Sequence, residues 1–221
     1  MSSTNAASRL QAILAAAPVV PVIVLDDWKA GVALARALVA GGLPAIEITL
    51  RTDGALDAIR AIAAEVEGAQ VGAGTVLTPQ QYADAVNANA RFVVSPGASA
   101  ALVQAAEDHD VPLLPGSATA TEAMTLLDYG YAIQKFFPAE PAGGVGYLGA
   151  LASPLPDIRF CPTGGIGFKN AAAYLALPNV VCVGGSWVAP KEAVAAGDWA
   201  RVETLAREAA GLRGTAVRKP K

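Results

Sequence analysis

Residues 45–74 read AIEITLRTDGALDAIRAIAAEVEGAQVGAG, and this stretch decides the fold. Two short apolar runs, Ala45–Thr49 and Gln70–Gly74, flank the helical pattern Gly54–Glu65. Runs this apolar are typical of strands buried on both faces, as in a parallel sheet covered by helices. The stretch therefore predicts a strand–helix–strand unit.

The same alternation continues along the chain. Six more strands are predicted, at Val19–Leu25, Phe92–Ser95, Val111–Leu114, Ala132–Phe136, Arg159–Cys161 and Val180–Gly184. The other predicted helices are Trp28–Ala40, Pro79–Ala88, Ser99–Asp108, Thr121–Asp128, Gly144–Ala152 and Asn170–Leu177, and a final helical region covers Lys191–Leu212. Eight strands in regular alternation leave two architectures, a closed barrel or an open doubly wound sheet.

Polar residues at the strand ends favour the barrel, because a barrel gathers its carboxyl ends around one mouth. They are Glu47 to Arg51, Thr75, Ser95, Lys135, Thr163 and Ser186. We therefore expect a single-domain α/β protein, a (β/α)8 TIM barrel over residues 18–212. An extra N-terminal helix (1–17) precedes it and a basic tail (213–221) follows.

Composition excludes several function classes. The chain has 221 residues, 53% apolar and 16% charged, with a net charge of −3 and scattered Lys and Arg. This balance predicts a large core, and neither nucleic acid nor a membrane surface as a partner. The apolar run Leu10–Ala17 could belong to a signal peptide, but Pro18 and Pro21 interrupt the next apolar run, so an N-terminal helix is favoured.

Metal ligands are scarce. The one histidine, His109, lies in the acidic stretch Glu107–Asp110, which is typical of a solvated loop. Cys161 and Cys182 are the only cysteines. Because zinc and iron sites need several such ligands, no metal is expected. The two cysteines could form one disulfide, but so sparse a pair is more typical of reduced thiols in a cytoplasmic enzyme.

Lys135 is the sharpest functional signal, because it alone among six lysines lies inside an apolar strand. Strand alternation puts Ile133, Lys135 and Phe137 on one face. If that face is the barrel interior, desolvation favours a free amine near neutral pH, which can attack a ketone to form an imine. The alternative is an outward lysine whose ammonium reaches water.

Glu47 is the second signal. Glu47, Thr49 and Arg51 share parity, so they could point together toward the mouth. A carboxylate near a lysine suits proton transfer, and the planar guanidinium of Arg51 matches a substrate carboxylate. The alternative is a structural Glu47–Arg51 ion pair.

Glycine-rich stretches follow the last two predicted strands, Thr163–Gly167 and Gly184–Trp187. Barrels often bind phosphate at these loops, through backbone amides that converge on the anion. Gly185 is accordingly a predicted substrate-binding residue; the alternative is that these glycines only form tight turns. By contrast, Gly72–Leu77 lacks the third glycine of a dinucleotide loop, so we expect no NAD.

Seven segments, taken together, resemble the 2-keto-3-deoxy-6-phosphogluconate (KDPG) aldolase family, which includes 4-hydroxy-2-oxoglutarate (KHG) aldolase activity. They are Pro18–Ile23, Glu47–Thr52, Val71–Leu77, Val94–Gly97, Lys135–Glu140, Phe160–Ile166 and Gly184–Trp187. The resemblance implies a class I aldolase, usually a homotrimer, that needs no metal or cofactor. Such an enzyme cleaves KDPG to pyruvate and glyceraldehyde 3-phosphate, or 4-hydroxy-2-oxoglutarate to pyruvate and glyoxylate.

The resemblance also implies residue roles. Lys135 matches the Schiff-base lysine and Glu47 the acid/base. Among the substrate-binding positions, Arg51, Thr75 and Thr163 match those for the pyruvate moiety, Pro96 and Phe137 those lining the pocket, and Gly164, Gly165 and Ser186 those at the phosphate end.

Two departures and two rival functions stay open. Ser117–Glu122 varies from some relatives, and Gly167–Lys169 replaces a more polar turn, which leaves the substrate preference open. One rival is a sister aldolase for the galactonate epimer, which shares the pyruvate half. The other is a sugar-phosphate-binding barrel without catalysis, against which a lysine in an apolar strand counts.

Overall fold

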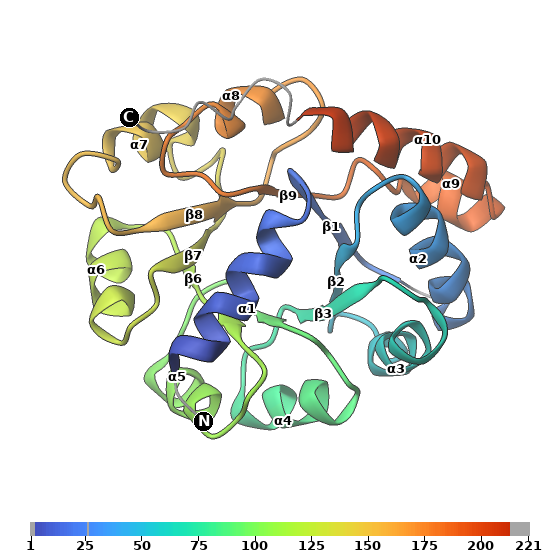
Figure 1. Cartoon of the computed structure of the whole chain (residues 1–221), viewed down its shortest axis with the longest axis horizontal. Helices are drawn as coiled ribbons and strands as arrows, with labels where there is room; N and C mark the ends of the chain where they lie inside the picture. Colours follow the sequence, from blue (N-terminus) through green and yellow to red (C-terminus); the bar gives the residue numbers. More distant parts are fainter. Residues whose placement is uncertain (1–2, 26, 213–221) are drawn as a thin grey trace.

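The computed structural model describes residues 3–25 and 27–212, so the predicted tail 213–221 lies outside the described residues. Strands curl about a centre and helices surround them, with α1 lying across one end (Figure 1). The strands are β1 Val19–Ile23, β2 Ala45–Thr49, β3 Gln70–Gly74, β4 Val93–Val94, β5 Leu113–Leu114, β6 Gly116–Ser117, β7 Ile133–Phe136, β8 Arg159–Pro162 and β9 Val183–Gly185. The helices are α1 Ser3–Ala15, α2 Gly31–Ala40, α3 Ala55–Glu65, α4 Pro79–Asn87, α5 Ala100–Glu107, α6 Ala120–Asp128, α7 Gly144–Ala150, α8 Ala171–Leu175, α9 Lys191–Ala196 and α10 Trp199–Ala210, with a 3-10 turn η1 at Trp28–Ala30.

The strands form two parallel groups, ordered β5-β4-β3-β2-β1-β9 and β6-β7-β8. Pro115, which has no N–H, separates β5 from β6, so these two segments are one barrel strand that belongs to both groups. At the other seam, the bridges Phe160–Val180 and Thr163–Gly184 join β8 to the segment that ends in β9. The described chain thus forms a TIM-barrel-like α/β fold, which confirms the predicted fold class.

Helix α1 covers the amino-terminal end of the barrel. Its Leu10 and Leu14 are buried in one cluster with side chains from several strands and from the residues next to them, among them Val20, Phe92 and Cys161. A much larger cluster fills the layer between strands and outer helices. No helix in residues 3–25 and 27–212 is long and apolar enough to cross a membrane. Burial of α1 against the strands leaves the opposite end as the mouth.

The last predicted element is divided. The helical region predicted over Lys191–Leu212 consists of two helices, α9 and α10. Gly197 ends α9 in a left-handed conformation with φ +66°, and the carboxylate of Asp198 then caps α10 by accepting a hydrogen bond from the Arg201 amide at 3.1 Å. The helical pattern continues through this turn, so the pattern alone did not locate the break within the predicted helical region.

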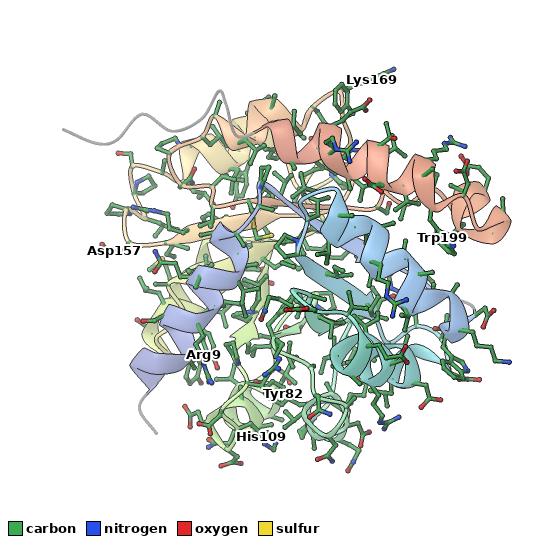
Figure 2. All side chains as sticks on the ribbon, turned by 45° about the vertical axis from the view of Figure 1, so that its right-hand side comes forward. Arg9, Tyr82, His109, Asp157, Lys169 and Trp199 are labelled. Carbon is green, nitrogen blue, oxygen red and sulfur yellow. The ribbon has the colours of Figure 1, made fainter. Side chains whose placement is uncertain are left out.

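The histidine and the two cysteines, which the sequence analysis considered as metal ligands, lie away from the mouth. His109 is half-buried in a loop after α5, where its ring stacks on Tyr82 with centroids 5.4 Å apart (Figure 2). Cys161 and Cys182 are buried in the barrel interior and form no disulfide with each other; their sulfur atoms lie 3.5 Å apart. Neither feature lies at the mouth.

Candidate active site

A lysine and a glutamate form a buried ion pair inside the barrel. The Nζ atom of Lys135, on β7, lies 3.2 Å from Oε1 of Glu47, on β2, and the two side chains are only 6% and 3% exposed. The same Nζ lies 5.4 Å from the centre of the Phe137 ring. The lysine therefore points inward, beside a group with which it can exchange a proton. Glu47 pairs with this lysine and not with Arg51, so a structural Glu47–Arg51 pair is excluded.

Glycines on neighbouring strands make room for this pair. A Cβ atom at Gly74, on β3, would come within 2.1 Å of Glu47 Oε1. Likewise, a Cβ atom at Gly184, on β9, would come within 2.2 Å of the Thr163 hydroxyl. No side chain larger than hydrogen fits at either position without displacing its polar neighbour. The strand glycines thus shape the interior around two predicted site residues.

Arg51 follows β2 at the mouth, and Thr75 orients its side chain. The Arg51 Nε donates to the Thr75 hydroxyl at 3.1 Å. Thr75 adopts φ +58°, a left-handed conformation that is uncommon and strained for a β-branched residue. Strain of this kind persists where the surrounding structure holds the residue in place, often at functional sites. Thr49, by contrast, donates its hydroxyl to the Ile23 carbonyl at 3.0 Å, so it ties β2 to β1.

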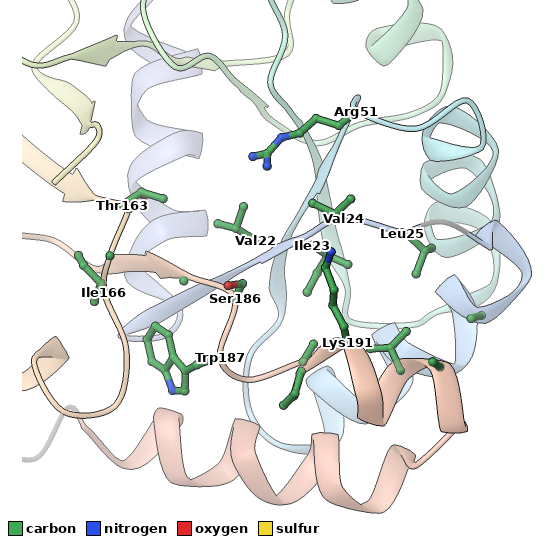
Figure 3. A pocket seen from close by; sticks show the side chains of 18 of the residues that line it. Val22, Ile23, Val24, Leu25, Arg51, Thr163, Ile166, Ser186, Trp187 and Lys191 are labelled. Atoms are coloured by element: carbon green, nitrogen blue, oxygen red, sulfur yellow. The ribbon is translucent and has the colours of Figure 1, made fainter. Parts of the chain in front are cut away.

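A cavity of about 690 Å³ lies at the mouth and brings together seven predicted site residues. Its wall includes Arg51, Phe137, Thr163, Gly164, Gly165, Gly185 and Ser186, several of which are drawn in Figure 3. Lys135 and Thr75 do not line this cavity, but they contact Phe137 and Arg51, which do. The buried ion pair therefore lies next to the wall of this cavity, beside Phe137.

Pro96 is the one predicted site residue that lies apart. It lines a second cavity, of about 270 Å³, between α5 and α6, together with Gly116 and Ser117. A Cβ atom at Gly116 would come within 2.2 Å of the Pro96 carbonyl oxygen. This proline therefore packs closely against the β6 strand, and its predicted contact with the substrate stays a prediction.

The turn after β8 presents successive glycines to the cavity. Gly164 and Gly165 adopt φ +104° and +77°, which glycine alone reaches without strain. The Ala139 and Glu140 amides donate to the carbonyls of Thr163 and Gly164 at 2.8 and 3.0 Å, which ties this turn to the segment after β7. Left-handed turns of this kind can form concave, anion-binding backbone sites.

Glu140 packs against the same turn. A Cβ atom added at Gly165 would come within 2.7 Å of the Glu140 side chain. Tyr174, on α8, donates a hydrogen bond to the Glu140 carboxylate. Burial, and then the neighbouring Glu140 carboxylate, raise the pKa of the Tyr174 hydroxyl above its ordinary value, so it stays a donor. The predicted phosphate turn is thus held by side chains that do not line the cavity.

Sequence reasoning missed some of the cavity wall. Ile23, Leu25 and Ile166 form an apolar part of it, and Trp187 folds its ring over Gly185, where a Cβ atom would lie 1.8 Å from the ring. Lys191, at the start of α9, also lines the cavity. Its sequence setting is that of an ordinary surface lysine, and no local pattern could have indicated this position.

Comparison with known proteins gives a consistent result. The family model for KDPG and KHG aldolase matches residues 10–205. The chain is 53% identical to the KHG/KDPG aldolase of Escherichia coli K12 over 199 residues, covering 90% of this chain and 93% of that protein. It is 54% identical to the 2-dehydro-3-deoxy-phosphogluconate aldolase of Dickeya dadantii over 197 residues, covering 89% and 92%.

A solved structure extends the similarity to the fold. The chain matches KDPG aldolase from Legionella pneumophila, which holds pyruvate captured at low pH as a covalent carbinolamine. The TM-score is 0.88 and the identity 44%, over 90% of this chain and 97% of that one. With the family model matching nearly the whole barrel, this chain belongs to the KDPG and KHG aldolase family.

Proposed function

We propose that this protein is a class I aldolase that cleaves KDPG to pyruvate and glyceraldehyde 3-phosphate, with Lys135 as the amine that forms the Schiff base. The observation that carries the proposal is the buried ion pair, in which Lys135 Nζ lies 3.2 Å from Glu47 Oε1. An amine can attack a ketone only after it loses a proton, and Glu47 is close enough to accept that proton. Binding alone gives no reason to bury this amine, which argues against a non-catalytic sugar-phosphate-binding barrel.

The first half of the reaction forms the imine. The neutral amine of Lys135 adds to the C2 ketone of the substrate and gives a carbinolamine. Protonation of the carbinolamine hydroxyl, for which Glu47 is the nearest acid, releases water and leaves a protonated imine. Arg51, oriented by Thr75 at 3.1 Å, binds the substrate carboxylate, and Phe137 and Thr163 border the same space.

The second half breaks the carbon–carbon bond. Glu47 accepts the proton of the C4 hydroxyl, the C3–C4 bond breaks, and its electron pair moves into the protonated imine to give an enamine. Glyceraldehyde 3-phosphate leaves. The enamine is then protonated at C3, and water hydrolyses the resulting imine to pyruvate and the free amine of Lys135. No step requires a metal or an organic cofactor.

The phosphate end of the substrate fits the far side of the cavity. The backbone turns at Gly164, Gly165 and Gly185, with the Ser186 hydroxyl, line the wall there. Amide N–H groups and a hydroxyl are suitable donors to phosphate oxygens. We assign these four residues to the aldehyde half of the substrate, and we keep Pro96 as a pocket-lining residue by extension from the family alone.

Two related substrates share the pyruvate half, 4-hydroxy-2-oxoglutarate and the galactonate epimer of KDPG. The names of the relatives favour KDPG and KHG activity. We also propose a homotrimer that acts in the cytoplasm, with residues 18–212 as its one catalytic domain, by extension from the family. Steady-state rates on the three substrates and light scattering of the purified protein test these points.

Reductive trapping tests the central claim. The protein is incubated with pyruvate and borohydride, and the modified residue is located by mass spectrometry. We expect one adduct, on Lys135, and no adduct on the exposed Lys169, which serves as an internal control (Figure 2). An adduct on another lysine, or none, would reject the role of Lys135.

A further inference from the structure

Lys191 is a second amine at the mouth of the barrel, apart from the Lys135–Glu47 pair. It is the first residue of α9 and lines the 690 Å³ cavity. Figure 3 shows its side chain extending from the start of α9 toward Ile23 and Val24, into the space that Arg51 faces from the other side. The cavity therefore lies between two cationic side chains.

The backbone of Lys191 is firmly held. Ala193, two residues further along, is buried, and its amide donates to the Pro190 carbonyl at 2.9 Å. Gly197 closes the helix at its other end. Since the main chain is fixed, the reach of the ammonium depends on the four-carbon side chain alone, which is flexible enough to follow a ligand.

Two described acids next to Lys191, Glu192 in sequence and Asp27 in the cavity wall, have interaction partners of their own. Glu192 pairs with Arg201 at 3.2 Å. Asp27, whose carboxylate is the only one among the described residues lining the cavity, accepts a hydrogen bond from the Lys29 amide at 3.0 Å. Within residues 3–25 and 27–212, Lys191 has no ion-pair partner. Its ammonium is thus available to an anion that enters the cavity.

We propose that Lys191 is a specificity-determining residue that binds the anionic end of the aldehyde half and makes the enzyme prefer a phosphorylated substrate. This inference rests on the proposed aldolase function. Arg51 binds the carboxylate in this proposal, and Lys191 adds a second full positive charge to the same cavity, whose wall also includes glycine backbone and the Ser186 hydroxyl. A phosphate dianion gains more from that charge than an uncharged hydroxyl does.

The test compares KDPG with its unphosphorylated analogue, 2-keto-3-deoxygluconate. For each protein the measured quantity is the ratio of kcat/KM for the two substrates. Lys191→Ala should lower this ratio about tenfold, the size expected for one charge-assisted hydrogen bond at a partly solvated site. Lys191→Arg keeps the charge and should restore most of the ratio. High salt should reduce the difference between wild type and Lys191→Ala, because exposed charges are screened.

The control is Lys169→Ala, which removes an exposed lysine from the loop after β8 that does not line the cavity. It should leave the ratio unchanged. A Lys191→Ala protein with the wild-type ratio, or one that loses both activities equally, overturns the assignment while the aldolase function stands. A wild-type protein that cleaves neither substrate and forms no pyruvate adduct overturns both.

Discussion

Replacing Lys135 by Met isolates the energetic consequence of the buried ion pair. Methionine has nearly the same length, so it fills the space but leaves the Glu47 carboxylate buried without its partner. At 3.2 Å and an effective dielectric constant of about 20, the attraction between the two charges is about 5 kcal/mol. Both ions also lose hydration, and removal of one partner from such pairs typically costs about 3–5 kcal/mol. We expect Lys135→Met to lower the free energy of unfolding by about 3 kcal/mol or more.

A double-mutant cycle separates this electrostatic effect from altered packing. The four proteins are wild type, Lys135→Met, Glu47→Gln and the double variant, and the assay is urea unfolding at neutral pH. Because the double variant carries neither charge, it should recover most of the loss, with a coupling energy of about 2–3 kcal/mol. Circular dichroism of each variant checks that the barrel is intact.

The result that would refute the reasoning is a coupling energy near zero. In that case, the two side chains would not interact in the folded protein, and Glu47 would have no direct route to the amine. Equal losses in Lys135→Met and in the double variant would instead attribute the destabilisation to packing of the methionine. Either result removes the observation on which the proposed mechanism depends.

Three further predictions use other parts of the fold. Glu47→Gln should lower kcat by about 10²–10⁴-fold, measured with KDPG; an unchanged rate would make the carboxylate structural. Thr75→Gly should relieve the strain at φ +58° and raise the melting temperature by about 2–4 °C, while it raises KM because Arg51 loses its hydrogen-bond acceptor; a lower melting temperature would contradict the strain. Glu122→Ala should cost about 0.5–1 kcal/mol at pH 7, because the Glu122 carboxylate caps α6. The Ala118 amide, which donates to that carboxylate, lowers the pKa of Glu122 below 4.5, so this contribution is present above about pH 4.5 and is lost as the pH falls through the lowered pKa; a difference that persists in acid would argue against the cap.

Local sequence predicted the central strands well. Strands β2 and β3 have the predicted bounds, because their apolar runs begin and end at polar residues or turns. The short strands β4 and β5 were predicted too long, and β6 was not predicted as a separate segment, since Pro115 interrupts the pairing and periodicity does not report such a break. The turn between α9 and α10 was not located within the predicted helical region, because Gly197 lies within an otherwise helical pattern.

The site could be predicted only in part, for a different reason. Lys135 stood out because a charge is unexpected in an apolar strand, and Glu47 stood out in the same way. Their distance depends on how strands 88 residues apart are placed around the barrel, which no local pattern encodes. Lys191 shows the opposite case, because its neighbours in sequence are those of a surface helix and only the closure of the barrel brings it to the cavity.

The position of the Glu47 carboxylate is set by residues without functional groups. Glu47 lies against the backbone of Gly74, so any side chain at position 74 would displace the carboxylate from Lys135 without touching the substrate. Thr163 depends on Gly184 in the same way. Parallel strands in a barrel place inward side chains side by side, and a large polar group on one strand needs a small neighbour on the next. The alternation of glycine with charged or polar residues around the mouth is therefore the physical condition that lets two ions be buried at 3.2 Å in an otherwise apolar interior.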